Sequence, residues 1–185
     1  MRQIFKEGFV TPQPVFIIAT YDENGRPNAM NAAWAGQVGN DIISVTLSSH
    51  KTTDNIRLNR EFTVSFATKA QAPACDYVGI VSGSEVPDKL EKCGFTTVKA
   101  PDVNAPIIEQ LPVAIECRVI EMQEEFGDIR VVAQIVGMSA DDSVLTDGKV
   151  DLGKLEPIMF DSAALTYRII GENVGGAWNI GKSIS

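Results

Sequence analysis

Alternation of apolar and polar side chains at every second residue is the feature that most constrains the fold of this chain. Ile43, Val45 and Leu47 are separated by Ser44 and Thr46. Successive side chains of a β-strand point to opposite faces, so this pattern predicts a strand with one buried and one polar face. The segments 62–67 and 111–122 alternate in the same way.

Turn signals divide the remaining apolar segments into further strands. Asn24-Gly25 follows an apolar run and predicts a tight hairpin, because both residues tolerate positive φ. The expected strands are 15–21, 28–37, 41–48, 62–67, 111–122, 128–138 and 167–170, and the expected short helices are 53–60, 77–81 and 88–92. Strands dominate and no composition break occurs, which predicts a mainly β fold, a Greek-key antiparallel β-barrel with short helices, as a single domain over 1–185.

Composition narrows the possible partners and compartment. The formal net charge is −8, which disfavours nucleic acid as a partner. The longest apolar run, Val15–Ala19, is far too short to span a membrane, and no signal peptide is recognisable at the start. The three cysteines, Cys75, Cys93 and Cys117, form no CxxC pair, so we expect free thiols in a reducing cytoplasm rather than a zinc or dithiol site.

Side-chain chemistry offers little for catalysis. His50 is the one histidine, which excludes a multi-histidine metal site, and no GxSxG segment accompanies it. The segment 176–183 matches the phosphate-binding pattern GxxxxGK[ST], but only two residues follow it, so the helix that such a loop requires cannot form. We expect no catalytic side chain and no metal, and infer that a cofactor carries any chemistry.

Two segments suggest where a cofactor binds. The phosphate segment lies between an expected strand and an expected helix and comprises Ser48, Ser49, His50, Lys51, Thr52 and Thr53. It offers hydroxyls, an ammonium group and the free amides of a helix N-terminus, although its Ser and Thr residues are equally suited to capping that helix. The ring segment comprises Asn31, Ala32, Ala33 and Trp34, whose small residues allow a planar ligand to approach the backbone or allow ordinary strand packing.

Taken together, these pieces resemble the flavoredoxin and flavin reductase-like family of FMN-binding split barrels. The matching pieces occur in the family's order and span nearly the whole chain. They are 14–20, 24–28, the ring segment, 49–56, Asp88-Lys89 with Gly94, and the tail pattern 167–182. The tail match also accounts for the phosphate-loop pattern at 176–183.

This resemblance implies a cofactor, an assembly and a set of site residues. It implies a homodimer with FMN at or near the subunit interface, the ring segment on the isoalloxazine and the phosphate segment on the phosphate. It also implies that Lys89 reaches the flavin or its phosphate, and that Phe160 and Trp178 line the site. Relatives often carry a histidine where this chain has Asp128, so the role of that histidine is not carried over.

The implied function is electron transfer through bound FMN between a reduced donor and an acceptor. The sequence leaves three forms of it open: an NAD(P)H-dependent flavin reductase, a non-enzymatic flavoredoxin-type carrier, and a flavin-binding module without turnover. No GxGxxG motif is present, so NAD(P)H would bind transiently, without a dinucleotide-binding domain. A redox protein is an equally suitable electron donor.

Overall fold

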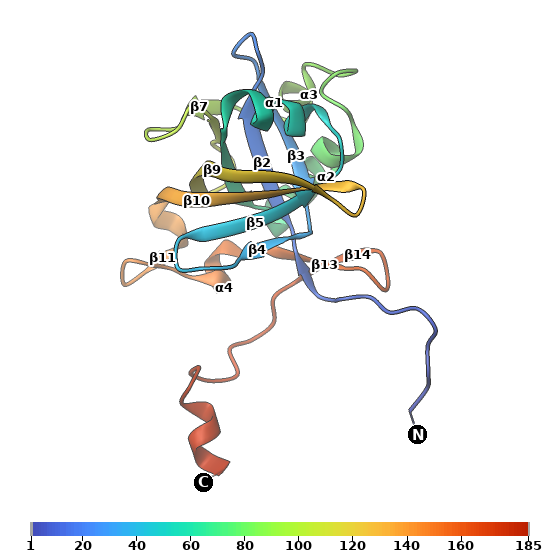
Figure 1. The fold of residues 1–185 in the computed structure, drawn as a ribbon. Helices are drawn as coiled ribbons and strands as arrows, with labels where there is room; N and C mark the ends of the chain where they lie inside the picture. Colours follow the sequence, from blue (N-terminus) through green and yellow to red (C-terminus); the bar gives the residue numbers. More distant parts are fainter. Residues whose placement is uncertain (1, 185) are drawn as a thin grey trace.

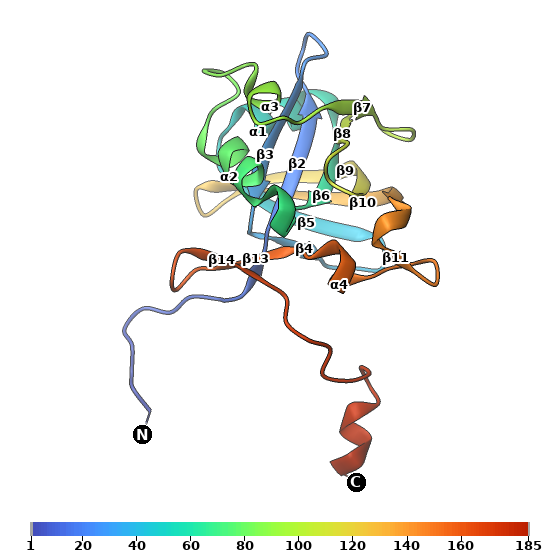
Figure 2. The same ribbon diagram turned by 180° about the vertical axis from the view of Figure 1, so that it is seen from behind.

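A curled antiparallel sheet of seven strands forms the body of the protein (Figures 1 and 2). The computed structural model describes residues 2–184. The strand order is β3-β2-β6-β9-β10-β5-β4. The strands are β2 (Phe16–Tyr21), β3 (Pro27–Ala32), β4 (Ala35–Gln37), β5 (Ile42–Leu47), β6 (Glu61–Phe66), β9 (Val113–Glu125) and β10 (Asp128–Ala140). The mainly β, antiparallel architecture is therefore confirmed.

The sheet is buried on both of its faces near β2. Phe16 and Ile18 point into the inner cluster, which also contains Phe62 and Val131. Ile17 lies in an outer cluster beneath the helices. A strand covered on both faces needs a continuous apolar run rather than alternation, which explains the sequence of Val15–Ala19.

One expected strand is in fact two. The prediction of a single strand over 28–37 is wrong, because the chain bends at Ala33–Trp34 between β3 and β4. These two short strands lie at opposite edges of the sheet, where β3 pairs with β2 and β4 pairs with β5. The bend carries the chain from one edge to the other across the open side of the half-barrel, and the carbonyl of Trp34 accepts the amide of Thr46 at 2.8 Å.

Three short helices cover the end of the sheet near β3 (Figure 1). They are α1 (Lys51–Asn59), α2 (Ala72–Ile80) and α3 (Lys89–Lys92). Two of them begin earlier than expected: α1 starts two residues before 53, and α2 starts five residues before 77. Pro73 stands in the first turn of α2, where its missing amide costs no helical hydrogen bond.

The remaining elements are short, and most of them escaped prediction. A second sheet has the order β1-β13-β14, and two small hairpins pair β7 with β8 and β11 with β12. These strands are β1 (Gln13–Pro14), β7 (Thr97–Lys99), β8 (Pro106–Ile108), β11 (Leu145–Thr146), β12 (Lys149–Val150), β13 (Ile158–Asp161) and β14 (Thr166–Ile169). The remaining helical turns are α4 (Leu152–Leu155) and the 3₁₀ turns Lys69–Gln71, Asp142–Val144 and Ile180–Ile184.

Two terminal arms leave the body at the end occupied by β13 and β14 (Figures 1 and 2). The N-terminal arm, residues 2–12, and the C-terminal tail, residues 171–184, are exposed throughout. The phosphate-loop pattern at 176–183 lies in this tail, away from any sheet. Within residues 2–184, no helix is long and apolar enough to cross a membrane.

Candidate functional site

A cavity of about 230 Å³ lies between β3, the start of α1 and the loop joining α2 to α3. It is lined by Asn28, Met30, His50, Lys51, Thr52, residues 78–83, Glu85 and Lys89. Three residues of the phosphate segment are therefore brought together with Lys89, which lies 37 positions after Thr52 in the sequence. The lining combines apolar groups with polar and charged ones, including Lys51 and Lys89, which suits a polar or anionic ligand.

The N-terminus of α1 opens on this cavity without a side-chain cap. His50 occupies the N-cap position and makes no capping hydrogen bond within residues 2–184. The hydroxyl of Thr53 donates to the carbonyl of Ser48 at 2.7 Å, and the hydroxyl of Ser48 donates to Asp128 Oδ1 at 2.8 Å. The alternative that Ser or Thr side chains cap this helix is thus not realised, and its first amides remain available to an anion.

Among the residues that the structure describes, Asn28 has a buried acceptor atom that accepts no hydrogen bond. Its Nδ2 donates to Thr52 Oγ1 at 2.7 Å, while Oδ1 is buried without a partner. Gly83 lies directly against this oxygen, and a Cβ at Gly83 would overlap it. A buried acceptor without a donor is unfavourable, so Oδ1 fits a ligand that supplies a hydroxyl or an amide.

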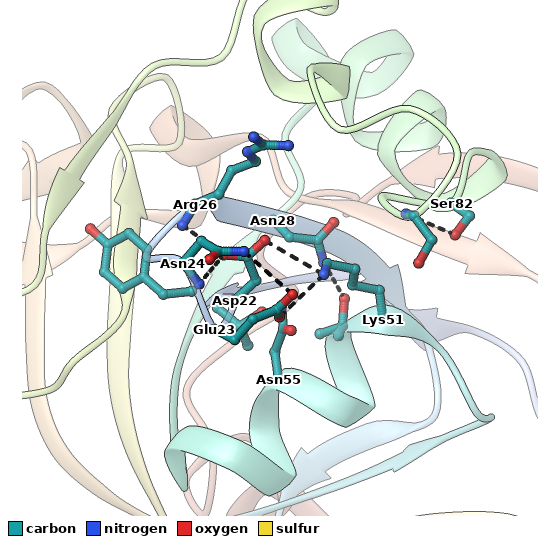
Figure 3. A network of polar contacts seen from close by, with 12 residues as sticks. Asp22, Glu23, Asn24, Arg26, Asn28, Lys51, Asn55 and Ser82 are labelled. Atoms are coloured by element: carbon teal, nitrogen blue, oxygen red, sulfur yellow. Dashed lines mark hydrogen bonds and ion pairs between the residues drawn. The ribbon is translucent and has the colours of Figure 1, made fainter.

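The ammonium of Lys51 lies between the carboxylates of the hairpin that joins β2 to β3 (Figure 3). Its Nζ is 3.5 Å from Asp22 Oδ2 and 3.6 Å from Glu23 Oε2. Burial opposes ionisation of Asp22, but the amides of Arg26 and Asn24 and the charge of Lys51 outweigh it and lower the pKa of Asp22. A bound anion would therefore share Lys51 with this hairpin.

Lys89 is a buried cation that forms no ion pair with a carboxylate in residues 2–184. Its Nζ donates to the carbonyls of Val78 and Val81, at 2.9 Å each, at the C-terminal end of α2. Burial lowers the pKa of Lys89 to about 8. The ammonium fixes the loop after α2 against α3, and places a positive charge at the cavity wall.

A second cavity, of about 150 Å³, lies beside the end of β3 and the start of the bend that follows it. It is lined by Val15, Asn31, Ala32, Ala33, Phe160 and Tyr167. Asn31 joins the two cavities, because its Nδ2 donates to the carbonyl of Cys75 in α2 at 3.3 Å, and its side chain lies against Gly79. The lining is more apolar than that of the first cavity, which suits a planar ring.

Not all the predicted residues lie in the two cavities. Trp34 is exposed next to the second cavity, and Trp178 lies in the C-terminal tail, apart from both. Ser49 faces a shallow groove beside the β9–β10 turn, with Asp128, and Thr53 is buried beneath the helix start. Nine of the thirteen predicted residues therefore lie in or beside the two cavities of the single chain. The other four are Ser48, Ser49, Thr53 and Trp178.

The sequence analysis missed four residues that contribute to the site. Asn28 belongs to a conspicuous hairpin, but nothing in the pattern marks its side chain as buried. Gly79 and Gly83 lie in a segment without a regular apolar–polar pattern. Only their lack of a side chain could have indicated that Asn31 and Asn28 pack directly against them. Tyr167 donates to Asp76 Oδ1 at 2.6 Å, and burial together with this bond raises the pKa of Tyr167 to about 12.

The family model described as "Flavin reductase like domain" matches residues 9–161, most of the chain. The chain belongs to the flavin reductase-like family. This result confirms the predicted family and, with it, a flavin-based redox function.

Solved structures support the assignment. A flavoredoxin of Desulfovibrio vulgaris (Miyazaki F) is 33% identical to this flavin reductase-like protein, with a TM-score of 0.92 over 98% of this chain and 100% of that one. A flavoredoxin from Methanosarcina acetivorans is 28% identical, with a TM-score of 0.90 over 100% and 99%. An FMN-binding domain of a flavin reductases-like enzyme from Shewanella baltica, at 20% identity and a TM-score of 0.77, covers 89% of both chains and shows the shared split-barrel fold.

Proposed function

We propose that this protein binds FMN along β3 and transfers electrons through it between a reduced donor and an acceptor. The observation that carries the proposal is the polar cavity in which an uncapped helix N-terminus, Lys51 and the unbonded Oδ1 of Asn28 converge. Membership of the flavin reductase-like family and the FMN named for the Shewanella baltica relative support the choice of flavin.

The residues present fit FMN chemically. The phosphate requires donors, which the first amides of α1 and the ammonium groups of Lys51 and Lys89 supply. The ribityl chain carries hydroxyls that can donate to Asn28 Oδ1. The isoalloxazine suits the less polar cavity formed by the ring segment and Phe160.

Bound FMN would supply the redox chemistry, by accepting and releasing a hydride or single electrons. The chain's own residues bind and orient it. The cations would neutralise the phosphate, and the backbone of the ring segment, which lines the second cavity, would hold the ring. Phe160 lines the less polar cavity and would shield one side of the ring from water.

A carrier function is the second candidate, and the comparisons give it specific support. The two flavoredoxins match this chain over nearly its full length at 33% and 28% identity, whereas the Shewanella baltica reductase-like domain matches less of it at 20%. A flavoredoxin-type carrier would receive electrons from a redox protein rather than from a nicotinamide.

Anaerobic absorbance spectroscopy of the purified protein tests both candidates. We expect a flavin spectrum with one FMN per chain. Bleaching by NADH or NADPH identifies a reductase, whereas bleaching only by a reduced protein donor and dithionite identifies a carrier. A protein that takes up no FMN in a fluorescence-quenching titration contradicts the proposal, and one whose bound flavin resists every donor contradicts the redox part of it.

We propose further that the protein is a cytoplasmic homodimer. Its three cysteines are all free, and burial raises the pKa of Cys75 and of Cys117 to about 12, as for inert core thiols. Such thiols are compatible with a reducing compartment. Dimerisation would cover the second cavity and Trp34, which one chain leaves open to solvent.

A further inference from the structure

The hairpin that joins β2 to β3 places two carboxylates beside a cation of the first cavity (Figure 3). Asp22 Oδ2 and Glu23 Oε2, the hairpin carboxylates, lie 3.5 Å and 3.6 Å from Lys51 Nζ. The side chain of Lys51 also lines the cavity. One ammonium can neutralise only one of these two carboxylates, so the group of three carries a net negative charge before any ligand binds.

The hairpin holds Asp22 in place without help from Lys51. Asp22 Oδ1 accepts the amides of Asn24 and Arg26 at 2.9 Å each, and the amide of Asp22 donates to the carbonyl of Arg26 at 2.9 Å. Asp22 is also buried, with 8% of its surface exposed. Turning this carboxylate away from an approaching anion would break the bonds that form the hairpin, so its charge is a fixed part of the site.

The cations of the cavity are sufficient for one phosphate but not for two. Within residues 2–184, the charged or basic side chains in its lining are His50, Lys51, Glu85 and Lys89. These cations, together with the first amides of α1, suit a single phosphate. Arg26 is the basic residue of the hairpin, but its guanidinium points away from Lys51 (Figure 3) and lines a separate groove beside α3.

A phosphate bound by Lys51 would lie close to the hairpin carboxylates. A charge-assisted hydrogen bond places a phosphate oxygen about 2.8 Å from Nζ, and hence within about 6.5 Å of both carboxylates. This separation is shorter than the Debye length of about 8 Å at physiological ionic strength, so salt screens the repulsion only in part. The cations offset it for one phosphate, whereas a second phosphate joined to the first gains no further cation from the lining.

We propose that Asp22 and Glu23 are specificity-determining residues, which restrict the phosphate site to a terminal phosphate monoester and exclude flavins with a second phosphate, such as FAD. This inference deepens the proposed function and rests on it, because it concerns the same site. The monoester of FMN concentrates nearly two negative charges on one group, which the cations at α1 can neutralise. The diphosphate of FAD extends its charge beyond those cations, where the hairpin carboxylates repel it.

Calorimetric titration of the flavin-free, full-length protein with FMN, FAD and riboflavin tests this assignment. We expect wild type to bind FMN at least about a hundredfold more tightly than FAD. Glu23→Gln removes one charge and should reduce this preference at least about threefold, and the double variant Asp22→Asn/Glu23→Gln at least about tenfold. The oxygen of Asn at position 22 can still accept the two hairpin amides, and unchanged riboflavin affinity shows that the cavity is intact.

A matched variant and a salt series separate charge from shape. Glu156→Gln is the control, because Glu156 also pairs with a lysine, Lys69 at 2.9 Å, but lies outside the cavity. It should leave the preference for FMN unchanged. Raising the salt from about 0.01 M to 1 M shortens the Debye length from about 30 Å to 3 Å, so it should reduce the preference more in wild type than in the double variant.

The outcomes separate this inference from the function on which it rests. A preference for FMN that is the same in wild type and both hairpin variants overturns the role of Asp22 and Glu23 and leaves FMN binding intact. Equal loss of preference in Glu156→Gln overturns it too, as does a wild type that binds FAD as tightly as FMN. If the double variant does not fold, Glu23→Gln decides, since its side chain is 63% exposed. Failure of wild type to bind FMN contradicts the proposed function itself.

Discussion

The hydroxyl of Ser48, just after β5, donates a 2.8 Å hydrogen bond to Oδ1 of Asp128, the first residue of β10. The carboxylate of Asp128 is thereby hydrogen-bonded to the first residue of the phosphate segment. The bond holds the segment in place, whereas the negative charge of Asp128 would oppose a phosphate bound at the proposed site at the start of α1.

Removing the charge of Asp128 should tighten FMN binding. In Asp128→Asn the side-chain oxygen still accepts from Ser48, so the loop is retained while the repulsion is lost. We expect FMN affinity to rise roughly threefold to tenfold at low salt, with riboflavin affinity unchanged, as measured by flavin fluorescence quenching. Ser48→Ala, which keeps the charge and loses the bond, is the control. Equal tightening of riboflavin would show that Asp128 does not act on the phosphate.

Lys51→Ala should weaken FMN by about tenfold to a hundredfold, because charge-assisted bonds to phosphate contribute roughly 1.5–3 kcal/mol before screening. Riboflavin lacks the phosphate, so its affinity should change little. Lys69→Ala is a matched control, since Lys69 also pairs with a carboxylate, Glu156 at 2.9 Å, but lies outside the cavity. If FMN affinity survives in Lys51→Ala, the ammonium remains with Asp22 and Glu23 when the ligand binds.

The burial of Lys89 should make FMN affinity depend on pH. Its pKa of about 8 means that the ammonium is charged below this pH and neutral above it, so FMN affinity should fall as pH rises through 8. The unfolded chain, with an ordinary lysine, holds this proton to higher pH, and the Lys89 contribution to the free energy of unfolding therefore rises between about pH 8 and 10.4.

A titration of FMN affinity from about pH 7 to pH 9.5 in wild type, Lys89→Met and Lys92→Met tests this assignment. Lys92 lies in the same short helix but is exposed and paired with Asp88 at 3.0 Å. We expect the pH dependence to disappear in Lys89→Met and to persist in Lys92→Met. A flat wild-type profile would mean that Lys89 stays with the carbonyls of α2 and does not reach the ligand.

Gly83→Ala should distort the first cavity through a steric clash, without changing any charge. The added Cβ overlaps Asn28 Oδ1, so either the loop moves outward or Asn28 loses its bond to Thr52. We expect a loss of about 1–3 kcal/mol in the free energy of unfolding and weaker binding of both FMN and riboflavin. Gly8→Ala, in open space, is the control for thermal denaturation. Unchanged stability and affinity would show that this loop is not packed on β3.

The sequence alone determined the elements whose signal is local. The alternation through Ile43, Val45 and Leu47 predicted β5 and its buried face, because side-chain direction in a strand depends only on position along it. Asn24-Gly25 predicted the β2–β3 hairpin because the tolerance of these two residues for positive φ is also a local property. The sequence segments that resemble the family identified it, and with it the cofactor class. They could do so because they occur in the family's order over nearly the whole chain.

The tertiary structure alone decided which segments meet. Alternation determines the face of a strand but not its neighbour, so nothing local separated β3 and β4 to opposite edges of the sheet at Ala33–Trp34. The pairing of Ser48 with Asp128, and of Lys51 with Asp22, depends on how distant elements pack. The burial of Asn28 and Lys89 follows from the same packing, because α2 and its loop close over β3. The electrostatics of the site therefore belong to the folded protein, whereas its membership of the family could be read from the chain.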